Sequence, residues 1–198
     1  MKLQRALIAT LMFTLLLAGV HYLHMAYLRV DVVFYAALGD ALVAAALTSA
    51  LLLLRPGFKT LGGFEKAQLI IIWLLLGYGF AITIPTVIDR SLSFYILEKL
   101  QQRGGGISRD RIRDVFINEY LPEHRLVDVR LTEQSASGTL VLERGCVKLT
   151  PKGRRIASFS RFYRQHFLPR QRLLMGEYTD DLTNPFRNTG SSPDYRCE

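Results

Sequence analysis

Three long apolar stretches separated by short polar segments dominate the first half of the chain. They cover residues 6–28 (ALIATLMFTLLLAGVHYLHMAYL), 32–54 (VVFYAALGDALVAAALTSALLLL) and 67–88 (AQLIIIWLLLGYGFAITIPTVI). None contains Lys or Arg. Each is long enough to cross a hydrocarbon core as a helix, which needs about 20 apolar residues. The pattern therefore predicts a transmembrane anchor, an α-helical bundle of three helices over residues 1–90.

The first stretch begins like a secretory signal, because MKLQR is a basic start. Its apolar part is longer than a signal needs, and no small-x-small cleavage site lies near Gly19. We interpret it as an uncleaved membrane helix. Pro85 should bend the third helix near its end, since proline removes a helical hydrogen bond.

Shorter amphipathic elements follow the last span. Residues 90–103 and 108–121 show helical spacing, separated by the glycines of 104–106. The segment 139–150 (TLVLERGCVKLT) contains two β-prone runs joined through Glu-Arg-Gly, which predicts a hairpin. Residues 152–167 return to helical spacing of apolar side chains, namely Ile156, Phe159, Tyr163 and Phe167.

This order of elements resembles a winged-helix domain over residues 91–168. The segment VKLTPKGRRIA (147–157) resembles the LTxKG closing strand and final helix of winged-helix families such as the PadR and MarR groups. SFYILEKLQQRGGGIS (93–108) is similar to their first helix and turn. We therefore expect a small α+β winged-helix-like soluble domain. One segment departs from the pattern, because residues 127–131 alternate apolar and polar side chains with a strand-like period of two, and a different small α+β fold stays open.

The resemblance implies positions for several polar residues. Arg125, Arg130 and Gln134 would lie on or near the recognition helix, and Arg144 and Lys148 would flank the wing. Such side chains can neutralise phosphates or contact base edges. We favour the alternative that they form a solvated face near anionic lipid headgroups, because the domain follows the last span almost without a linker.

Asp40 is the only acid inside a predicted span. It could serve as a proton or ion site with His21 or His24 of the neighbouring helix. We favour a structural hydrogen bond between helices, or to a partner subunit, since a transport path usually needs more polar groups. Small residues of the second span should permit close helix packing; they are Ala37, Gly39, Ala41, Ala44, Ala45 and Ala46.

Membrane orientation is not decided by the sequence. Lys and Arg occur in comparable numbers on both sides of the spans, although the net charge is +8. Cys146 and Cys197 would pair if the domain lay outside the cytoplasm. We favour unpaired cysteines and lean towards a cytoplasmic domain, in a protein of the bacterial inner membrane.

The remaining sequence limits the classes of function. Residues 169–198 are expected to form an extended tail, since residues 176–198 are polar and have no apolar period, and Asp180 and Asp181 are expected to be solvated acids. No phosphate loop, dinucleotide fingerprint or nucleophile motif occurs, and we expect no metal, cofactor, enzymatic activity or small-molecule substrate.

We expect an accessory or scaffolding subunit of a membrane complex, with a larger integral-membrane partner and a protein-binding soluble module. The alternative is a membrane-tethered transcription regulator, the only interpretation that includes nucleic acid.

Overall fold

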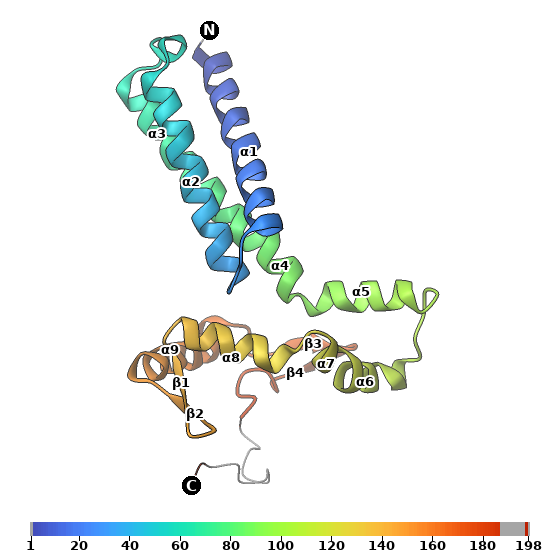
Figure 1. The fold of residues 1–198 in the computed structure, drawn as a ribbon. Helices are drawn as coiled ribbons and strands as arrows, with labels where there is room; N and C mark the ends of the chain where they lie inside the picture. Colours follow the sequence, from blue (N-terminus) through green and yellow to red (C-terminus); the bar gives the residue numbers. More distant parts are fainter. Residues whose placement is uncertain (1, 187–196, 198) are drawn as a thin grey trace. The chain divides into compact units, whose positions relative to one another are not determined.

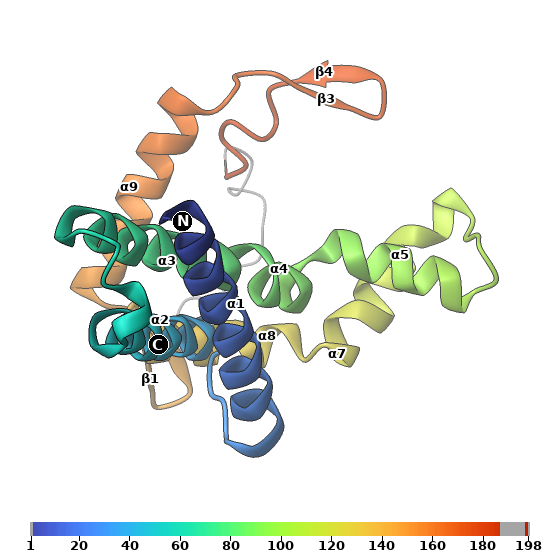
Figure 2. The same ribbon diagram turned by 90° about the horizontal axis from the view of Figure 1, so that it is seen from above.

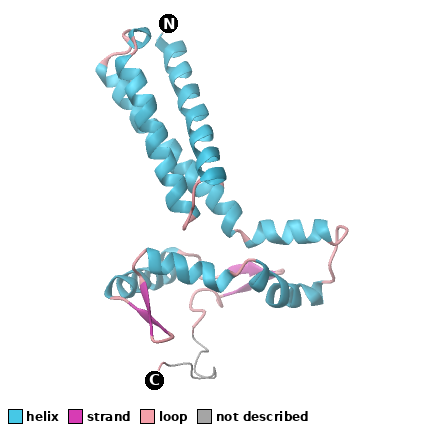
Figure 3. Cartoon of the chain, viewed as in Figure 1, coloured by secondary structure: helices cyan, strands magenta, loops and turns pink. Residues whose placement is uncertain are grey.

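The computed structural model describes residues 2–186 and residue 197. It is mainly helical, with two small antiparallel hairpins (Figure 3). The chain divides into two compact units, residues 1–120 and 121–198.

Three long helices form most of the first unit. They are α1 (Lys2–Tyr27), α2 (Val33–Leu54) and α3 (Gly63–Thr83), with the short 3-10 helix η1 (Pro56–Phe58) in the turn between α2 and α3. The three lie side by side in both views (Figures 1 and 2). All three, the last including α4, are long and apolar enough to cross a membrane. This confirms the three predicted membrane-length apolar helices.

The core of the bundle is built from two aromatic rings and a row of small residues. Phe13 of α1 stacks on Trp73 of α3 with ring centroids 5.8 Å apart, and the Trp73 indole N–H donates to Thr10 Oγ1 at 3.1 Å. A Cβ on Gly77 would lie 2.7 Å from Ala41 Cβ, so a side chain at 77 would force α2 and α3 apart. Four alanines of the predicted small-residue surface are buried: Ala37, Ala41, Ala44 and Ala45.

Pro85 interrupts the third long helix as predicted. The helix ends at Thr83, and α4 (Pro85–Arg90) begins with the proline in its first turn. Proline is tolerated there because the first turn has no intrahelical acceptor for its missing N–H. Thr86 Oγ1 donates to the Ala81 carbonyl at 2.7 Å across the break.

Short helices complete the first unit. They are α5 (Leu92–Gln102), the 3-10 helix η2 (Arg109–Arg111), α6 (Ile112–Val115) and the π-helix η3 (Phe116–Tyr120). Tyr95 of α5 packs against Tyr120 with ring centroids 4.5 Å apart. Glu119 Oε2 pairs with the Lys99 ammonium at 2.9 Å, and its other oxygen pairs with Arg103 at 2.8 Å. These contacts connect α5 to η3 across the glycine turn.

The second unit contains α7 (Leu121–Glu123), α8 (Leu126–Ala136), the hairpin β1 (Leu140–Glu143) and β2 (Cys146–Leu149), and α9 (Pro151–Phe167). The hairpin register pairs Leu140 with Leu149 and Glu143 with Cys146. Arg144 and Gly145 connect the strands with φ of 51° and 78°, the positive values of a type I′ turn. The predicted hairpin and final helix are therefore present.

Residues 126–136 are helical, so the strand-like alternation did not predict the structure there. Val127 and Val129 are both exposed, and their alternation therefore does not mark a buried strand face. Two ion pairs at i,i+3 spacing hold the helix instead, Arg125 with Asp128 and Arg130 with Glu133, each at 2.8 Å.

Part of the segment predicted as an extended tail forms a second hairpin. It consists of β3 (Arg172–Leu174) and β4 (Glu177–Thr179), joined through Met175 and Gly176. Figure 2 shows it following the end of α9. Residues 187–196 and 198 of the predicted tail lie outside the described residues.

Candidate functional site

Asp40, His21 and His24 form a polar cluster between α1 and α2. His21 Nδ1 lies 2.8 Å from Asp40 Oδ2, and His24 Nδ1 lies 2.5 Å from Asp40 Oδ1. Asp40 is 3% exposed, whereas the two imidazoles are partly exposed. The three residues named from the sequence are thus brought together, with one histidine on each carboxylate oxygen. The role of this contact stays a prediction.

With Asp40 as a carboxylate, the hydrogen-bond geometry fixes the tautomer of each histidine. An ionised carboxylate only accepts hydrogen bonds, so each imidazole must carry its proton on Nδ1 to bind it. The Nε2 atoms then face away from Asp40. The ring of Phe80 packs edge-on against His21 with centroids 5.1 Å apart. The cluster is therefore a hydrogen-bonded link between two helices, with an apolar wall beside His21.

The cluster lies near one end of the helical hairpin. His24 is three residues from the end of α1, and Asp40 is seven residues into α2. At about 1.5 Å per residue, these positions are roughly 5–10 Å from the helix ends. An open groove of about 610 Å³ runs beside the cluster. Its lining is apolar apart from His24 and Asp40: Val20, Leu23, Tyr27, Leu28, Gly39 and Val43.

Most of the polar residues assigned to nucleic acid or partner contact have partners within their own unit. Arg125 and Arg130 pair with acids of α8, as described above. Lys148 pairs with Glu143 across the hairpin at 3.0 Å. Gln134 Oε1 accepts a hydrogen bond from the Thr139 hydroxyl. Of the five, Arg144 is the one placed at the exposed hairpin turn. Internal pairing lowers the charge that Arg125, Arg130 and Lys148 offer to a phosphate.

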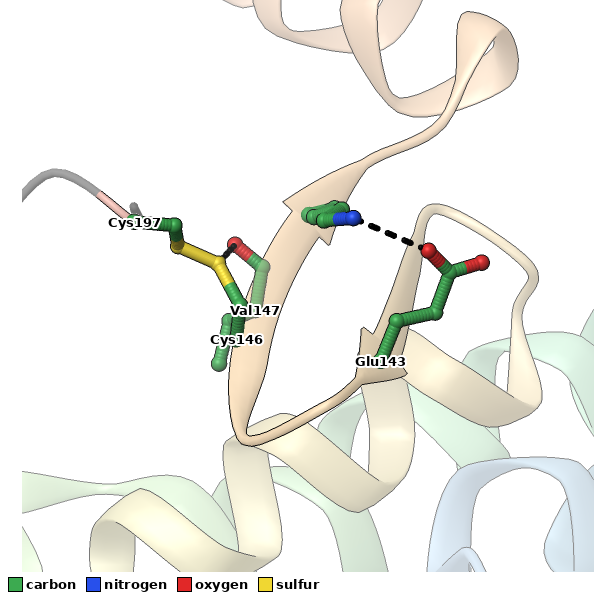
Figure 4. The surroundings of a disulfide bond; sticks show 5 residues. Glu143, Cys146, Val147 and Cys197 are labelled. Atoms are coloured by element: carbon green, nitrogen blue, oxygen red, sulfur yellow. Dashed lines mark hydrogen bonds and ion pairs between the residues drawn. A yellow bond between two sulfur atoms is a disulfide. The ribbon is translucent and has the colours of Figure 1, made fainter.

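The hairpin β1–β2 has two chemically different faces. Residues paired directly across an antiparallel ladder share a face, so one face carries Leu140, Leu142, Val147 and Leu149, here named the hairpin face. Leu142, Val147 and Leu149 are exposed. The opposite face carries the Glu143–Lys148 ion pair and Cys146 (Figure 4).

Cys146 and Cys197 form a disulfide with Cα atoms 6.0 Å apart (Figure 4). The favoured interpretation of unpaired cysteines was therefore wrong. Cys146 lies on the opposite side of the strand from the hairpin face, where it is free to meet a distant segment of the chain.

Sequence reasoning missed the concentration of charge on α9. No acid occurs between residues 144 and 175, and five cations lie within α9 itself: Lys152, Arg154, Arg155, Arg161 and Arg164. That acid-free run was visible in the sequence. The winged-helix resemblance did not indicate it, because it places polar contacts on the preceding helix and the wing.

Comparison with known proteins adds no identification. No family model, no curated protein and no solved structure matches the chain. Among residues 2–186 and 197, no group of three or more His, Cys, Asp or Glu side chains is arranged to hold a metal ion. The features that bear on function are the three membrane-length helices and the surfaces of the second unit.

Proposed function

We propose that the protein is a non-enzymatic accessory or scaffolding subunit of a membrane complex, and that the hairpin face of its second unit binds a partner protein. The observation that carries the proposal is the exposure of this face. Leu142 is 55% and Leu149 53% exposed on a hairpin stabilised by only one ladder. A two-stranded hairpin with an uncovered apolar face gains stability when another surface packs on it.

The burial pattern of the whole second unit supports the same conclusion. Among its described residues, only Thr139 and Gly153 are buried. Apolar side chains of the unit therefore remain accessible, and exposed apolar surface of this kind marks interaction sites. Binding to a partner would remove the hairpin face from water.

The anchor supports a partner that is itself in the membrane. His24 and Asp40 border a groove that is otherwise apolar and open at the surface of the helical hairpin. Polar side chains that line a lipid-exposed groove are unfavourable in hydrocarbon, and a helix from another subunit would cover them. A larger integral-membrane protein would fill the apolar groove and also cover its two polar side chains.

The disulfide favours a location outside the cytoplasm for the second unit. Disulfides persist in oxidising compartments and are rare in the cytosol, where thiols are kept reduced. We therefore propose an extracytoplasmic second unit, although the sequence alone leaned towards the cytoplasm. With three spans, the N-terminus would then face the cytoplasm.

We retain the winged-helix-like assignment for residues 91–168 as part of the proposal, and the second unit holds its last part, residues 121–168. The order α8, hairpin, α9 is that of a recognition helix, a wing and a final helix. The alternative function, a membrane-tethered transcription regulator, is less well supported. Arg125, Arg130 and Lys148 are already paired with acids, and the disulfide is unfavourable in the compartment that contains chromosomal DNA.

Site-specific photo-crosslinking in the cells that make the protein tests the proposed interface. A photoreactive residue at Leu142 should give a discrete adduct with a membrane protein. The same residue at Val141, the neighbouring strand position on the opposite face, should give little or none. The Leu142→Asp variant should lose the partner in co-purification while retaining its own membrane insertion. Equal adducts from both positions would contradict a specific hairpin face.

Two further results would overturn the choice of function. Recovery of one enriched motif from a random duplex DNA library, lost in Arg130→Ala, would favour the regulator, because a DNA reader keeps a preference of about 10³-fold or more at physiological salt. Failure of membrane-impermeant maleimide to label the reduced cysteines in intact cells, with labelling after permeabilisation, would place the unit in the cytoplasm.

A further inference from the structure

We propose that α9 lies on the surface of an anionic bilayer, with its aromatic face in the interfacial region. This surface is separate from the hairpin face, and the inference does not depend on the proposed protein partner. It rests on three observations: an uncovered aromatic stripe, a set of arginines without acid partners among the described residues, and three membrane-length apolar helices in the same chain.

The aromatic stripe is continuous along α9. Phe159 contacts Tyr163, and Tyr163 contacts Phe167, with ring centroids 6.1 and 5.3 Å apart. Together with Ile156, these side chains fall within an arc of about 80° at 100° per residue. Phe159 is 65% and Phe167 64% exposed. Gly153, in the first turn of α9, packs against Thr139 and is not part of the stripe. The stripe therefore contributes little to the fold of its own unit.

The charges of the Lys and Arg side chains of α9 are all positive and suit contact with an anionic surface. Within the described residues, no ion pair or hydrogen bond engages the guanidinium groups of Arg154, Arg155, Arg161 or Arg164. Arg125, which precedes α8, and Arg130 within it behave differently, since both pair with acids of α8. Charges on α9 are therefore available to an external anion.

Lipid explains this combination better than a protein surface does. Interfacial helices carry Phe and Tyr on one face and Lys or Arg beside it, and their long cationic side chains extend to the phosphates. Arg155 and Arg164 flank the stripe on its two sides by the same helical geometry. The anchor keeps the unit close to a bilayer, so docking requires no separate encounter. Each cation near an anionic surface favours the docked state by about fivefold.

Hydrogen exchange of the full chain in nanodiscs tests the proposal. The amides of 151–167 should exchange more slowly in discs of phosphatidylcholine with phosphatidylglycerol than in discs of phosphatidylcholine alone. Arg155→Gln with Arg164→Gln should lower the ratio of docked to undocked helix by about 25-fold in the anionic discs. Arg125→Gln with Arg130→Gln is the matched control, because it removes the same charge from paired positions of α8 and should change α9 exchange little.

A second pair of variants separates docking from folding. Phe159→Ser with Tyr163→Ser should abolish the lipid-dependent protection of α9 while the β1–β2 amides keep theirs, because neither side chain is buried. Equal exchange of α9 in the two lipid compositions would overturn the proposal. Protection that appears only when a second protein is present would also overturn it, and would assign the stripe to a protein interface. The Leu142 crosslink should persist in both sets of α9 variants, so the two proposals fail independently.

Discussion

Gly153, in the first turn of α9, packs directly against the carbonyl oxygen of Thr139 at the start of the hairpin. A Cβ at residue 153 would overlap that oxygen and would also lie 2.8 Å from Leu149 Cδ1. The Thr139 carbonyl meanwhile accepts from the Thr150 N–H and hydroxyl at 3.1 and 3.0 Å. Glycine in the LTPKG segment therefore permits the helix to close against the hairpin.

We predict that Gly153→Ala destabilises the second unit by about 1–3 kcal/mol, the usual cost of inserting a methyl group where no space exists. Because alanine is otherwise the better helix former, the sign of the effect is diagnostic. Ser158→Ala, at an exposed position of the same helix, serves as the control. The stability is measured by thermal unfolding of the detergent-solubilised chain, and hydrogen exchange of the hairpin amides reports on the second unit. A stabilised Gly153→Ala chain would contradict this packing.

The three consecutive glycines after α5 provide a second prediction with an internal control. Gly104 and Gly105 have φ of 79° and 100°, whereas Gly106 does not have a positive φ. A β-branched residue tolerates positive φ poorly. Gly104→Val and Gly105→Val should each lower stability by about 1–3 kcal/mol, and Gly106→Val should be close to neutral. Three neutral variants in a thermal unfolding assay would mean that the turn imposes no defined backbone.

The sequence predicted the elements whose signal is local. The three membrane-length helices follow from apolar length, the break at Pro85 from the missing N–H, and the turn at residue 104 from glycine. The hairpin at 140–149 followed from β-prone runs around Arg144 and Gly145. In each case a few neighbouring residues determine the backbone, so a linear pattern is sufficient.

Features that apolar periodicity does not report, or that depend on distant residues, could not be predicted in the same way. The alternation at 127–131 resembled a strand, because the i,i+3 ion pairs that favour a helix there have no effect on apolar periodicity. Cys146 and Cys197 are 51 residues apart, and no local pattern predicts their pairing. The Asp40 cluster could be predicted in part. Its members were identifiable as rare polar groups in apolar helices, but their contact required the register of α1 on α2.

The Asp40 cluster yields a prediction that separates a structural role from a proton-carrying role. Asp40→Asn should keep assembly and function, because the amide oxygen still accepts from one histidine. Asp40→Leu should weaken the helical hairpin by about 0.5–2 kcal/mol, since both histidines lose their acceptor. A double-mutant cycle that combines Asp40→Leu with His24→Leu, measured by thermal unfolding in detergent, gives the interaction energy between Asp40 and His24. Loss of function in Asp40→Asn with the hairpin intact would instead favour proton transfer.

Glu119 makes the stability of the first unit sensitive to pH in the acid range. Its hydrogen bond to Lys99, reinforced by Arg103, holds the pKa of this carboxyl below its ordinary value of 4.5. A depressed folded-state pKa stabilises the fold above the unfolded-state pKa, and this stabilisation is lost as the pH falls through the folded-state value. Between pH 7 and 3, the wild type should therefore lose more thermal stability than Glu119→Gln. Glu98→Gln, an exposed acid of α5, should follow the wild type.

Opening the disulfide should destabilise the second unit while leaving the first unit unchanged. Cross-linking residues 51 positions apart restricts the unfolded chain, and the loop-entropy relation gives about 4 kcal/mol for a loop of this length. Cys146→Ser, Cys197→Ser and the double variant should lose the same stability, because each removes the same bond. Dithiothreitol should reproduce this loss in the wild type and have no effect on the variants.

Thermal unfolding of the solubilised chain measures the loss. Hydrogen exchange of the β1–β2 and α9 amides reports on the second unit, and exchange of the α1–α3 amides reports on the first unit. A double variant less stable than either single one would mean that the two cysteines contribute separately, and the disulfide would then no longer explain how the C-terminal end is held to the hairpin.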